Sequence, residues 1–351
     1  MNVRLPKGLA KVTQLAEFDA IIDVRSPGEF AEDRVPGALN CPVLSNDERA
    51  RVGTLYKQVS PFEARKVGAA LIARNIGSHL DTHFQDKPKH WRPLVYCWRG
   101  GQRSGIFTHF LREIGWDAHR IEGGYKTWRR HVIDQLEVLP QQFSYTVISG
   151  ATGNAKSRVL EAMAELGAQV LHLEALAAHK GSVLGGLPGT PQPTQRLFET
   201  LLLTTLGQFD AAQPVFVEAE SKRIGQLHLP DAMIGAIRSS PCLRIEAPLA
   251  ARVDFLLRDY DYFLANPALL AEKLRHLKGL QSNETLDAWQ AMIAAGDFAD
   301  LYRELLEKHY DPLYQRSQLK NYSSYDSAAS ITSNDLSPAG IRALAAQILA
   351  G

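Results

Sequence analysis

The sequence predicts an α/β protein with two parallel-sheet domains and a C-terminal part made largely of helices. In both halves of the chain, short apolar runs alternate with helical patterns, which is typical of parallel sheets covered by helices on both faces. The pattern breaks at residues 139–142, so we expect domains at 1–138 and 139–351. A length of 351 residues fits two domains better than one.

The first domain shows strand, loop and helix signals in a regular order. An apolar run at 20–24 predicts a buried strand, and Ser-Pro-Gly at 26–28 predicts a turn and the start of a helix. Residues 93–96 predict a second strand, which enters a polar glycine-containing loop. Residues 105–114 have apolar side chains at helical spacing and predict an amphipathic helix. A short strand at 118–121, a Glu-Gly-Gly turn and another helix complete this domain.

The second domain begins with a strand at 145–149, followed by a glycine-containing loop and a helix at 158–166. Residues 170–173 and 215–217 predict further core strands. Beyond residue 247 helical patterns dominate. The expected helices are at 250–264, 267–277, 286–295, 298–309 and 338–350, with a loop rich in Ser, Asn and Asp at 321–335.

Composition indicates a globular enzyme-sized protein, with 45% hydrophobic and 22% charged residues. No apolar run approaches the ~20 residues that span a bilayer, and the first residues lack the apolar core of a signal peptide. We therefore expect a cytoplasmic protein without a membrane partner. The net charge of +1 neither requires nor excludes a nucleic acid partner.

Cys97 is the first candidate catalytic residue. It ends a predicted parallel strand and precedes a glycine-containing loop and a helix, the position at which α/β sheets bind ligands. The backbone amides of residues 98–104 and the helix N-terminus would attract an anion. Arg99 and Arg103 would add positive charge and favour a nucleophilic thiolate. The alternative is a purely structural cysteine, buried at the end of a strand beside two surface arginines. The cysteine, two arginines and a Gly-Gly pair within seven residues favour a catalytic site.

The other two cysteines are expected to be structural. Cys41 lies in the segment PGALNCPV, where an apolar core residue is usual, and Cys242 follows Ser-Ser-Pro. The three cysteines lack the paired spacing of zinc ligands. We therefore expect no structural metal.

Four segments of the first domain resemble the successive blocks of a rhodanese domain: DVRSPGEF, VPGALNCPV, VYCWRGGQRS and IEGGYKTW. This resemblance covers about residues 10–135 and implies that Cys97 carries sulfur or selenium. One difference concerns Arg103, which lies six positions after Cys97, whereas ordinary rhodaneses have the basic residue five positions after the cysteine. The longer loop is similar to that of dual-specificity phosphatases, so the shape of a bound anion is expected to govern this site.

The segment GATGNAKS, residues 150–157, resembles a phosphate-binding P-loop between a strand and a helix. Its backbone amides would hold phosphates, Lys156 would pair with their charge and Ser157 would bind a phosphate oxygen or Mg²⁺. Ala155 replaces the glycine of the consensus, so its methyl group either crowds the loop or demands different backbone angles. The residues expected to bind phosphate or diphosphate are Gly150, Thr152, Gly153, Asn154, Ala155, Lys156 and Ser157.

Glu218 is a candidate for binding a metal ion or positioning water, because it ends the predicted strand in VFVEAES. A solvated strand terminus is the alternative interpretation. The residues therefore allow Mg²⁺ as a cofactor but do not assign a metal site.

A rhodanese-like domain followed by this P-loop resembles the tRNA 2-selenouridine synthase family. Segments HLEALAAHKGSVLG, QPTQRLFE and VFVEAESKRIG are also similar to family segments. The resemblance implies a transferase that replaces sulfur with selenium in 2-thiouridine at the tRNA wobble position. It implies selenophosphate and geranyl diphosphate as co-substrates, an S-geranylated intermediate, no tightly bound cofactor, and a selenophosphate-supplying enzyme as a partner.

Two other functions remain open from the residues. One is a Cys-dependent phosphatase fused to a P-loop module, which the spacing of Arg103 favours. The other is a rhodanese-like sulfur carrier whose P-loop domain is a nucleotide-binding regulatory module. Whether the P-loop binds ATP or only a prenyl diphosphate is also open. Candidate contacts to RNA are the basic residues at 126–130, 179–180, 222–223 and 273–278, with Arg252 and Arg258.

Overall fold

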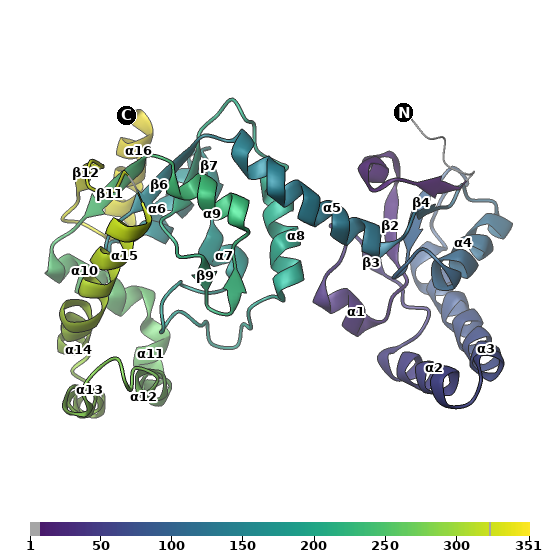
Figure 1. Ribbon diagram of the computed structural model, residues 1–351, viewed down its shortest axis with the longest axis horizontal. Helices are drawn as coiled ribbons and strands as arrows, with labels where there is room; N and C mark the ends of the chain where they lie inside the picture. The colour runs from purple at the N-terminus through teal and green to yellow at the C-terminus, as the bar shows by residue number, and fades with distance from the viewer. Residues whose placement is uncertain (1–7, 323) are drawn as a thin grey trace. The chain divides into compact units, whose positions relative to one another are not determined.

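A computed structural model describes residues 8–322 and 324–351 of the chain (Figure 1). It divides into two compact units, Met1–Gln135 and Leu136–Gly351. Helix α5 (Tyr125–Val138) runs across this division.

The first unit contains a five-stranded sheet in which all strands are parallel, in the order β1-β5-β4-β2-β3. Its strands are β1 (Leu9–Ala10), β2 (Ala20–Asp23), β3 (Leu39–Asn40), β4 (Pro93–Tyr96) and β5 (His119–Ile121). Its helices are the 3₁₀ helix η1 (Val12–Glu17), α1 (Pro27–Glu32), α2 (Asn46–Gln58), α3 (Pro61–His79), the π-helical turn η2 (Leu80–Phe84) and α4 (Gln102–Ile114), with α5 following β5.

The central strand β4 is buried along its whole length, and its side chains alternate between two faces. Val95 and Cys97 belong to the core cluster that also holds residues of α3 and α4, including Ile76 and Phe107. Tyr96 points to the other face, where the guanidinium of Arg25 lies 5.5 Å from its ring centroid. The strand therefore places Cys97 on the α3 and α4 side of the sheet.

The second unit also contains a five-stranded parallel sheet, in the order β12-β11-β6-β8-β7. Its strands are β6 (Tyr145–Ser149), β7 (Gln169–Leu171), β8 (Val215–Glu218), β11 (Cys242–Glu246) and β12 (Ala329–Thr332). A small antiparallel hairpin joins β9 (Arg223–Ile224) to β10 (Leu227–His228). Its helices are η3 (Leu139–Gln142), α6 (Lys156–Glu165), α7 (Leu173–Ala177), α8 (Gln195–Leu206), α9 (Asp231–Arg238), α10 (Leu249–Asp259), α11 (Asp261–Ala265), α12 (Pro267–Arg275), α13 (Asn283–Ala295), α14 (Phe298–Leu305), the π-helical turn η4 (Leu306–Tyr310), α15 (Asp311–Asn321) and α16 (Pro338–Ala350).

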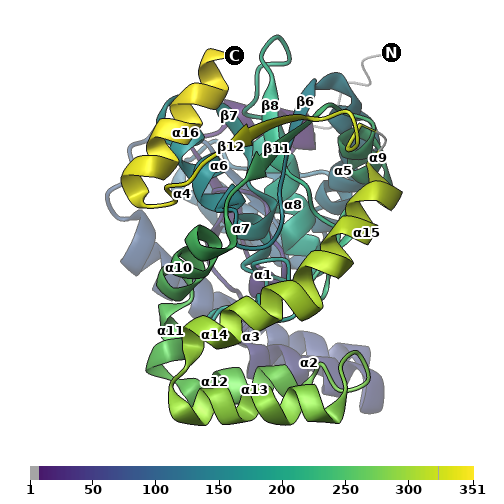
Figure 2. The same cartoon turned by 90° about the vertical axis from the view of Figure 1, so that its left-hand side faces the viewer.

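Strand β6 lies at the centre of this second sheet, and helices cover both of its faces. Ile148 belongs to the core cluster formed with α6 and α16. Tyr145, on the opposite face by the two-residue period, contacts Met233 of α9 through its hydroxyl group. The helical segments α10 to α14 extend the Ile148 core, with the indole of Trp289 fully buried, and Figure 2 shows α12 and α13 lying side by side.

The structure confirms the predicted fold class and most predicted elements. Strands β4 and β6 have the predicted bounds, and the final helix is α16. The predicted helix at 250–264 is divided at Tyr260 into α10 and α11.

The predicted loop at 321–335 contains a fifth strand, β12, which pairs in parallel with β11. Most of its residues are exposed, so no apolar run marks it in the sequence. The sequence patterns also do not predict helices α2 and α3.

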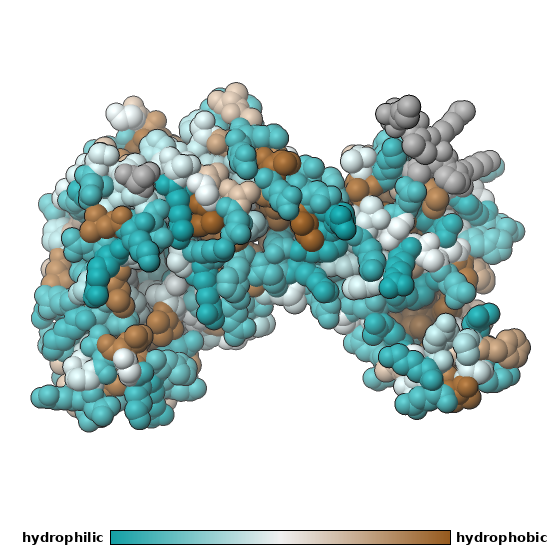
Figure 3. All heavy atoms as spheres, in the orientation of Figure 1, coloured by the Kyte–Doolittle hydropathy of each residue, from teal (hydrophilic) through white to brown (hydrophobic). Residues whose placement is uncertain are grey.

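The described residues include no helix long and apolar enough to cross a membrane. In the view of Figure 3, hydrophilic residues predominate on the surface, and hydrophobic residues occur in small groups.

Candidate functional site

The loop between β6 and α6 has the backbone shape that a phosphate-binding loop needs. Gly150 and Gly153 have φ angles of +148° and +85°, and Ala155 has a φ of +55°. Ala155 therefore adopts the left-handed conformation that a glycine at this position would adopt without strain. The methyl group leaves the loop shape intact, and the conformation costs about 1 kcal/mol.

The amides of this loop are available to an anion. Over the described part of the chain, the backbone amides of residues 151–153 and 155–157 donate no hydrogen bond, whereas Asn154 donates to Ala151. Helix α6 begins at Lys156, so its N-terminal partial positive charge lies at the same place. Unpaired amides at a helix N-terminus form an anion-binding site.

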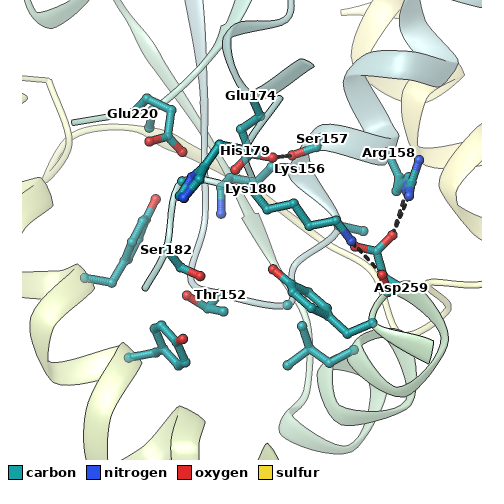
Figure 4. A pocket seen from close by; sticks show the side chains of 18 of the residues that line it. Thr152, Lys156, Ser157, Arg158, Glu174, His179, Lys180, Ser182, Glu220 and Asp259 are labelled. Atoms are coloured by element: carbon teal, nitrogen blue, oxygen red, sulfur yellow. Dashed lines mark hydrogen bonds and ion pairs between the residues drawn. The ribbon is translucent and has the colours of Figure 1, made fainter. Parts of the chain in front are cut away.

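Lys156 and Ser157 are held by neighbouring groups at the start of α6. The ammonium group of Lys156 donates to the carbonyl of Gly150 and lies 5.2 Å from the ring centroid of Tyr314. The hydroxyl of Ser157 donates to Glu174 Oε2 at 2.6 Å, an interaction drawn in Figure 4. The Tyr314 hydroxyl accepts from the amide of Gly150 at 2.7 Å.

Two carboxylates that the sequence analysis did not select, Glu174 and Glu220, line the cavity beside Lys156. Burial, and then the neighbouring carboxylates, raises the pKa of both groups. Burial lowers the pKa of Lys156, while the same carboxylates oppose that change. Both glutamates lie in the segments that carried the family resemblance, and their proximity to Lys156 arises only from folding.

Glu218 ends β8 as predicted, but its side chain is fully buried and does not line the cavity. It forms an ion pair with His172 at 2.6 Å and accepts a hydrogen bond from the amide of Leu173 at 2.9 Å. These two interactions attach β8 to the start of α7, the helix that carries Glu174. In this arrangement Glu218 positions α7.

The cavity at the phosphate loop has a volume of about 560 Å³. The loop residues that line it are Thr152, Gly153, Ala155, Lys156 and Ser157, whereas Gly150 and Asn154 do not. Apolar and aromatic side chains line other parts of it. These are Val183, Leu187, Phe255, Leu256, Tyr260, Tyr310, Leu313 and Tyr314. The volume lies within the range of sites for small ligands.

Two basic residues proposed as RNA contacts have other partners. Arg252 is buried, donates to the carbonyl of Thr152 at 2.7 Å and forms an ion pair with Asp311 at 2.6 Å. Lys180 lines the cavity and pairs with Asp259 at 2.6 Å. Arg252 therefore holds the phosphate loop, and the proposal that it contacts RNA is wrong for this arrangement because its donors are occupied.

In the first unit, Cys97 follows β4, and its side chain is nearly buried, with 3% of its surface exposed. Its sulfur lies 3.2 Å from the hydroxyl of Ser104 on α4. The amides of residues 98–104 donate no hydrogen bond over the described chain, as expected for an anion-binding loop.

Gly100 and Gly124 allow the Cys97 loop to pack closely against the turn after β5. A Cβ atom on Gly124 would lie 2.3 Å from the carbonyl oxygen of Cys97 and 2.4 Å from the amide of Gly100. A Cβ atom on Gly100 would lie 2.9 Å from the carbonyl oxygen of Ile121. A side chain at either position would therefore prevent the Cys97 loop and the turn after β5 from packing together.

The two arginines of this loop differ in position. Arg103 donates to both oxygens of Glu29, at 2.7 and 3.2 Å, and Arg49 pairs with the same carboxylate at 3.1 Å. Burial would raise the pKa of Glu29, but the bonds and charge of Arg103 bring it below its ordinary value. Arg99 is exposed and has no such partner among the described residues.

A hollow of about 430 Å³ lies beside Arg103, and Trp98 and Arg49 also line it. Cys97 is not among its lining residues. The sequence predicted the loop after β4 but neither the burial of the sulfur nor the pairing of Arg103 with Glu29. Cys41 and Cys242 are both buried, as predicted.

Known protein families match both units of the chain. Residues 9–131 match the rhodanese-like domain, and residues 143–283 match the tRNA 2-selenouridine synthase AAA domain. The tRNA 2-selenouridine synthase of Nitrosomonas europaea is 38% identical over 273 residues, covering 76% of this chain and 70% of the relative. That of Alcanivorax borkumensis is 35% identical over 326 residues, covering 84% and 88%. The chain belongs to the tRNA 2-selenouridine synthase family.

Proposed function

We propose that this protein replaces the sulfur of 2-thiouridine at the tRNA wobble position with selenium from selenophosphate. In the proposed sequence, the sulfur first attacks the allylic carbon of geranyl diphosphate. A carbon–sulfur bond forms, the carbon–oxygen bond breaks and diphosphate leaves. Hydrogen selenide released from selenophosphate then attacks C2 of the S-geranylated base. A carbon–selenium bond forms, the carbon–sulfur bond breaks and geranyl thiol leaves, because alkylation makes the sulfur a better leaving group.

The observation that carries this proposal is the cavity at the phosphate loop. Unpaired amides and Lys156 would stabilise the charge of a diphosphate leaving group. Phe255, Leu256 and Tyr260 line the same cavity and offer an apolar surface to a ten-carbon chain. A prenyl diphosphate has both of these chemical parts.

A magnesium ion fits the donors at this loop. Desolvation and then repulsion by neighbouring carboxylates raise the pKa of the half-buried Glu174 and Glu220, and a cation would relieve that repulsion. Ser157 and Glu174, already joined at 2.6 Å, would hold the ion, since Mg²⁺ prefers carboxylate and hydroxyl oxygens. When bound, Mg²⁺ would neutralise diphosphate charge.

In the same proposal, the loop of Cys97 binds selenophosphate, and the Cys97 thiolate attacks its phosphorus. A sulfur–phosphorus bond forms, the phosphorus–selenium bond breaks and hydrogen selenide leaves, and water then hydrolyses the phosphorylated cysteine to phosphate and the free thiol. The free amides of residues 98–104 and the exposed Arg99 support binding of an anion. With 3% exposure, Cys97 reacts only after this loop moves, and Arg103 serves the anion only after it leaves Glu29.

Mass spectrometry of tRNA nucleosides tests the two roles, after incubation of thiolated tRNA with selenophosphate and geranyl diphosphate. We expect Cys97→Ser to stop selenium incorporation while S-geranyl-2-thiouridine still forms. We expect Lys156→Ala to reduce geranylation at least tenfold, since it removes a charge that acts on the leaving group. Cys242→Ser and Lys320→Ala are the matched controls, because Cys242 lies in β11 and Lys320 on the exposed part of α15.

Equal selenation by wild type and Cys97→Ser would refute the proposed role of Cys97. Tight ATP binding with steady turnover, and no competition by diphosphate, would refute a prenyl diphosphate site. An assay with an aryl phosphate separates this proposal from a Cys-dependent phosphatase. Multiple turnover of tRNA excludes a pure sulfur carrier.

A further inference from the structure

Cys41, His79 and His83 lie together in the first unit although they are far apart in the sequence. Cys41 follows β3, His79 is the last residue of α3 and His83 lies in the π-helical turn η2. One possible ligand atom from each side chain lies within 4.8 Å of the others. None of these residues lines the hollow beside Arg103 or the cavity at the phosphate loop.

The imidazole of His79 is oriented as in a metal ligand. Its Nε2 atom lies 3.0 Å from the carbonyl oxygen of Pro42, to which it donates in the tautomer that carries the proton on Nε2. That tautomer leaves the lone pair of Nδ1 free. A metal-binding histidine commonly donates its other N–H to a backbone carbonyl in this way.

The π-helical turn brings the two imidazoles close together. Their ring centroids are 5.7 Å apart and the ring planes are inclined by 23°. A π-helical turn at the end of an α-helix is rare and occurs frequently at functional sites. The backbone leaves the regular geometry of α3 directly after His79, and His83 lies within the π-helical turn that follows.

The three side chains differ in exposure from the interior to the surface. Cys41 is fully buried, His79 is half-buried and His83 is exposed. An ion would reach the thiol from the side of His83.

We propose that Cys41, His79 and His83 bind one zinc ion, with a fourth position open to solvent or an exogenous ligand. One sulfur and two imidazole nitrogens match the ligand preference of Zn²⁺. Ligand atoms of a tetrahedral zinc ion lie about 3.3–3.8 Å apart, so side chains whose ligand atoms lie within 4.8 Å of one another need to approach by only about 1 Å to close the site. The ion would join β3 to the end of α3.

Cobalt substitution tests this site independently of tRNA modification. The full-length protein is treated with a chelator, dialysed and titrated with Co²⁺. We expect one equivalent of Co²⁺ to give visible d–d bands of tetrahedral intensity and a thiolate-to-cobalt charge-transfer band, both lost when Zn²⁺ is added. Elemental analysis after dialysis against Zn²⁺ should give one ion per chain.

Variants assign the ligands. His83→Ala should weaken Co²⁺ binding at least tenfold, and because His83 is exposed this variant keeps the fold. His90→Ala is the matched control, an exposed histidine of the same unit, and should bind as the wild type does. Cys41→Ala should abolish the charge-transfer band, whereas Cys97→Ser should retain it.

Absence of the charge-transfer band in the wild-type protein would overturn the proposal. So would equal Co²⁺ affinity of His83→Ala and His90→Ala. A band lost in Cys97→Ser but kept in Cys41→Ala would place the metal on the other thiol and would also contradict it.

Discussion

At the scale of single residues, His172 is held between two carboxylates. It forms ion pairs with Glu218 at 2.6 Å and with Glu161 at 3.5 Å. Burial would lower its pKa, but these two partners raise it to about 10. His172 is therefore charged in the folded protein at neutral pH, and the pair that it forms with Glu218 positions α7.

The stability of the second unit should depend on pH through His172. Its folded pKa, about 10, is above the ordinary value of 6.5, so its contribution is complete below pH 6.5 and is lost as the pH rises to 10. Across this range we expect the free energy of unfolding of the wild type to fall by about 2 kcal/mol more than that of His172→Gln. Urea unfolding of both proteins at pH 6, 8 and 10 measures this difference.

The exposed His228 provides the control for this measurement, since His228→Gln should follow the wild-type pH dependence. A His172→Gln variant whose stability falls in parallel with the wild type would show that the ion pairs do not act as described.

At the scale of elements, short helices carry the groups of the phosphate site, and their ends are set by backbone conformation. Helix α7 carries Glu174 and ends at Ala178, which has a φ of +49°. Ala155, before α6, has a φ of +55°. Both alanines occupy a conformation that a Cβ atom disfavours, so the site tolerates strain at two of its helix ends.

We expect Ala178→Gly to stabilise the second unit by about 0.5–1 kcal/mol, because glycine adopts the left-handed C-terminal position of a helix without strain. Ala175→Gly, at an exposed position inside the same helix, should instead destabilise it by about 0.5–1 kcal/mol. Urea unfolding of both variants provides the comparison. Destabilisation by both variants to the same extent would contradict the role given to the conformation of Ala178.

At the scale of the whole molecule, each unit has a core cluster of its own. One cluster surrounds β4 and α4 and includes Phe107, and the other surrounds β6 and α6 and includes Trp289. The sequence pattern breaks after α5, which ends at Val138. A cut after residue 138 leaves that helix complete.

We expect fragments 1–138 and 139–351 to fold separately, since each has a parallel sheet and a core cluster. Each fragment should show cooperative urea unfolding and the helical circular dichroism of its elements. A cut after residue 124, which removes α5 from the first fragment and leaves β5 complete, is the control and should abolish its cooperative unfolding, because α5 carries the buried Tyr125 and Trp128. A fragment 1–138 without cooperative unfolding would contradict two independently folding domains.

Local sequence patterns determined the parts of this protein that depend on neighbouring residues. Periodic apolar residues identified β4, β6 and α16, and glycines identified the two loops, because these features require only the local alternation of side chains and the backbone freedom of glycine. They did not identify β12, whose pairing with β11 is a contact between distant segments.

Only the tertiary structure decided which groups meet. Glu174 and Glu220 reach Lys156, Glu29 takes Arg103, and Cys41 lies beside two histidines, each from segments far apart in the chain. Burial then changes the pKa of Glu174 and Glu220, a property that a residue acquires only from its surroundings. Spacing along the chain fixes the shape of a loop, whereas charge, burial and ligand sets depend on contacts that folding creates.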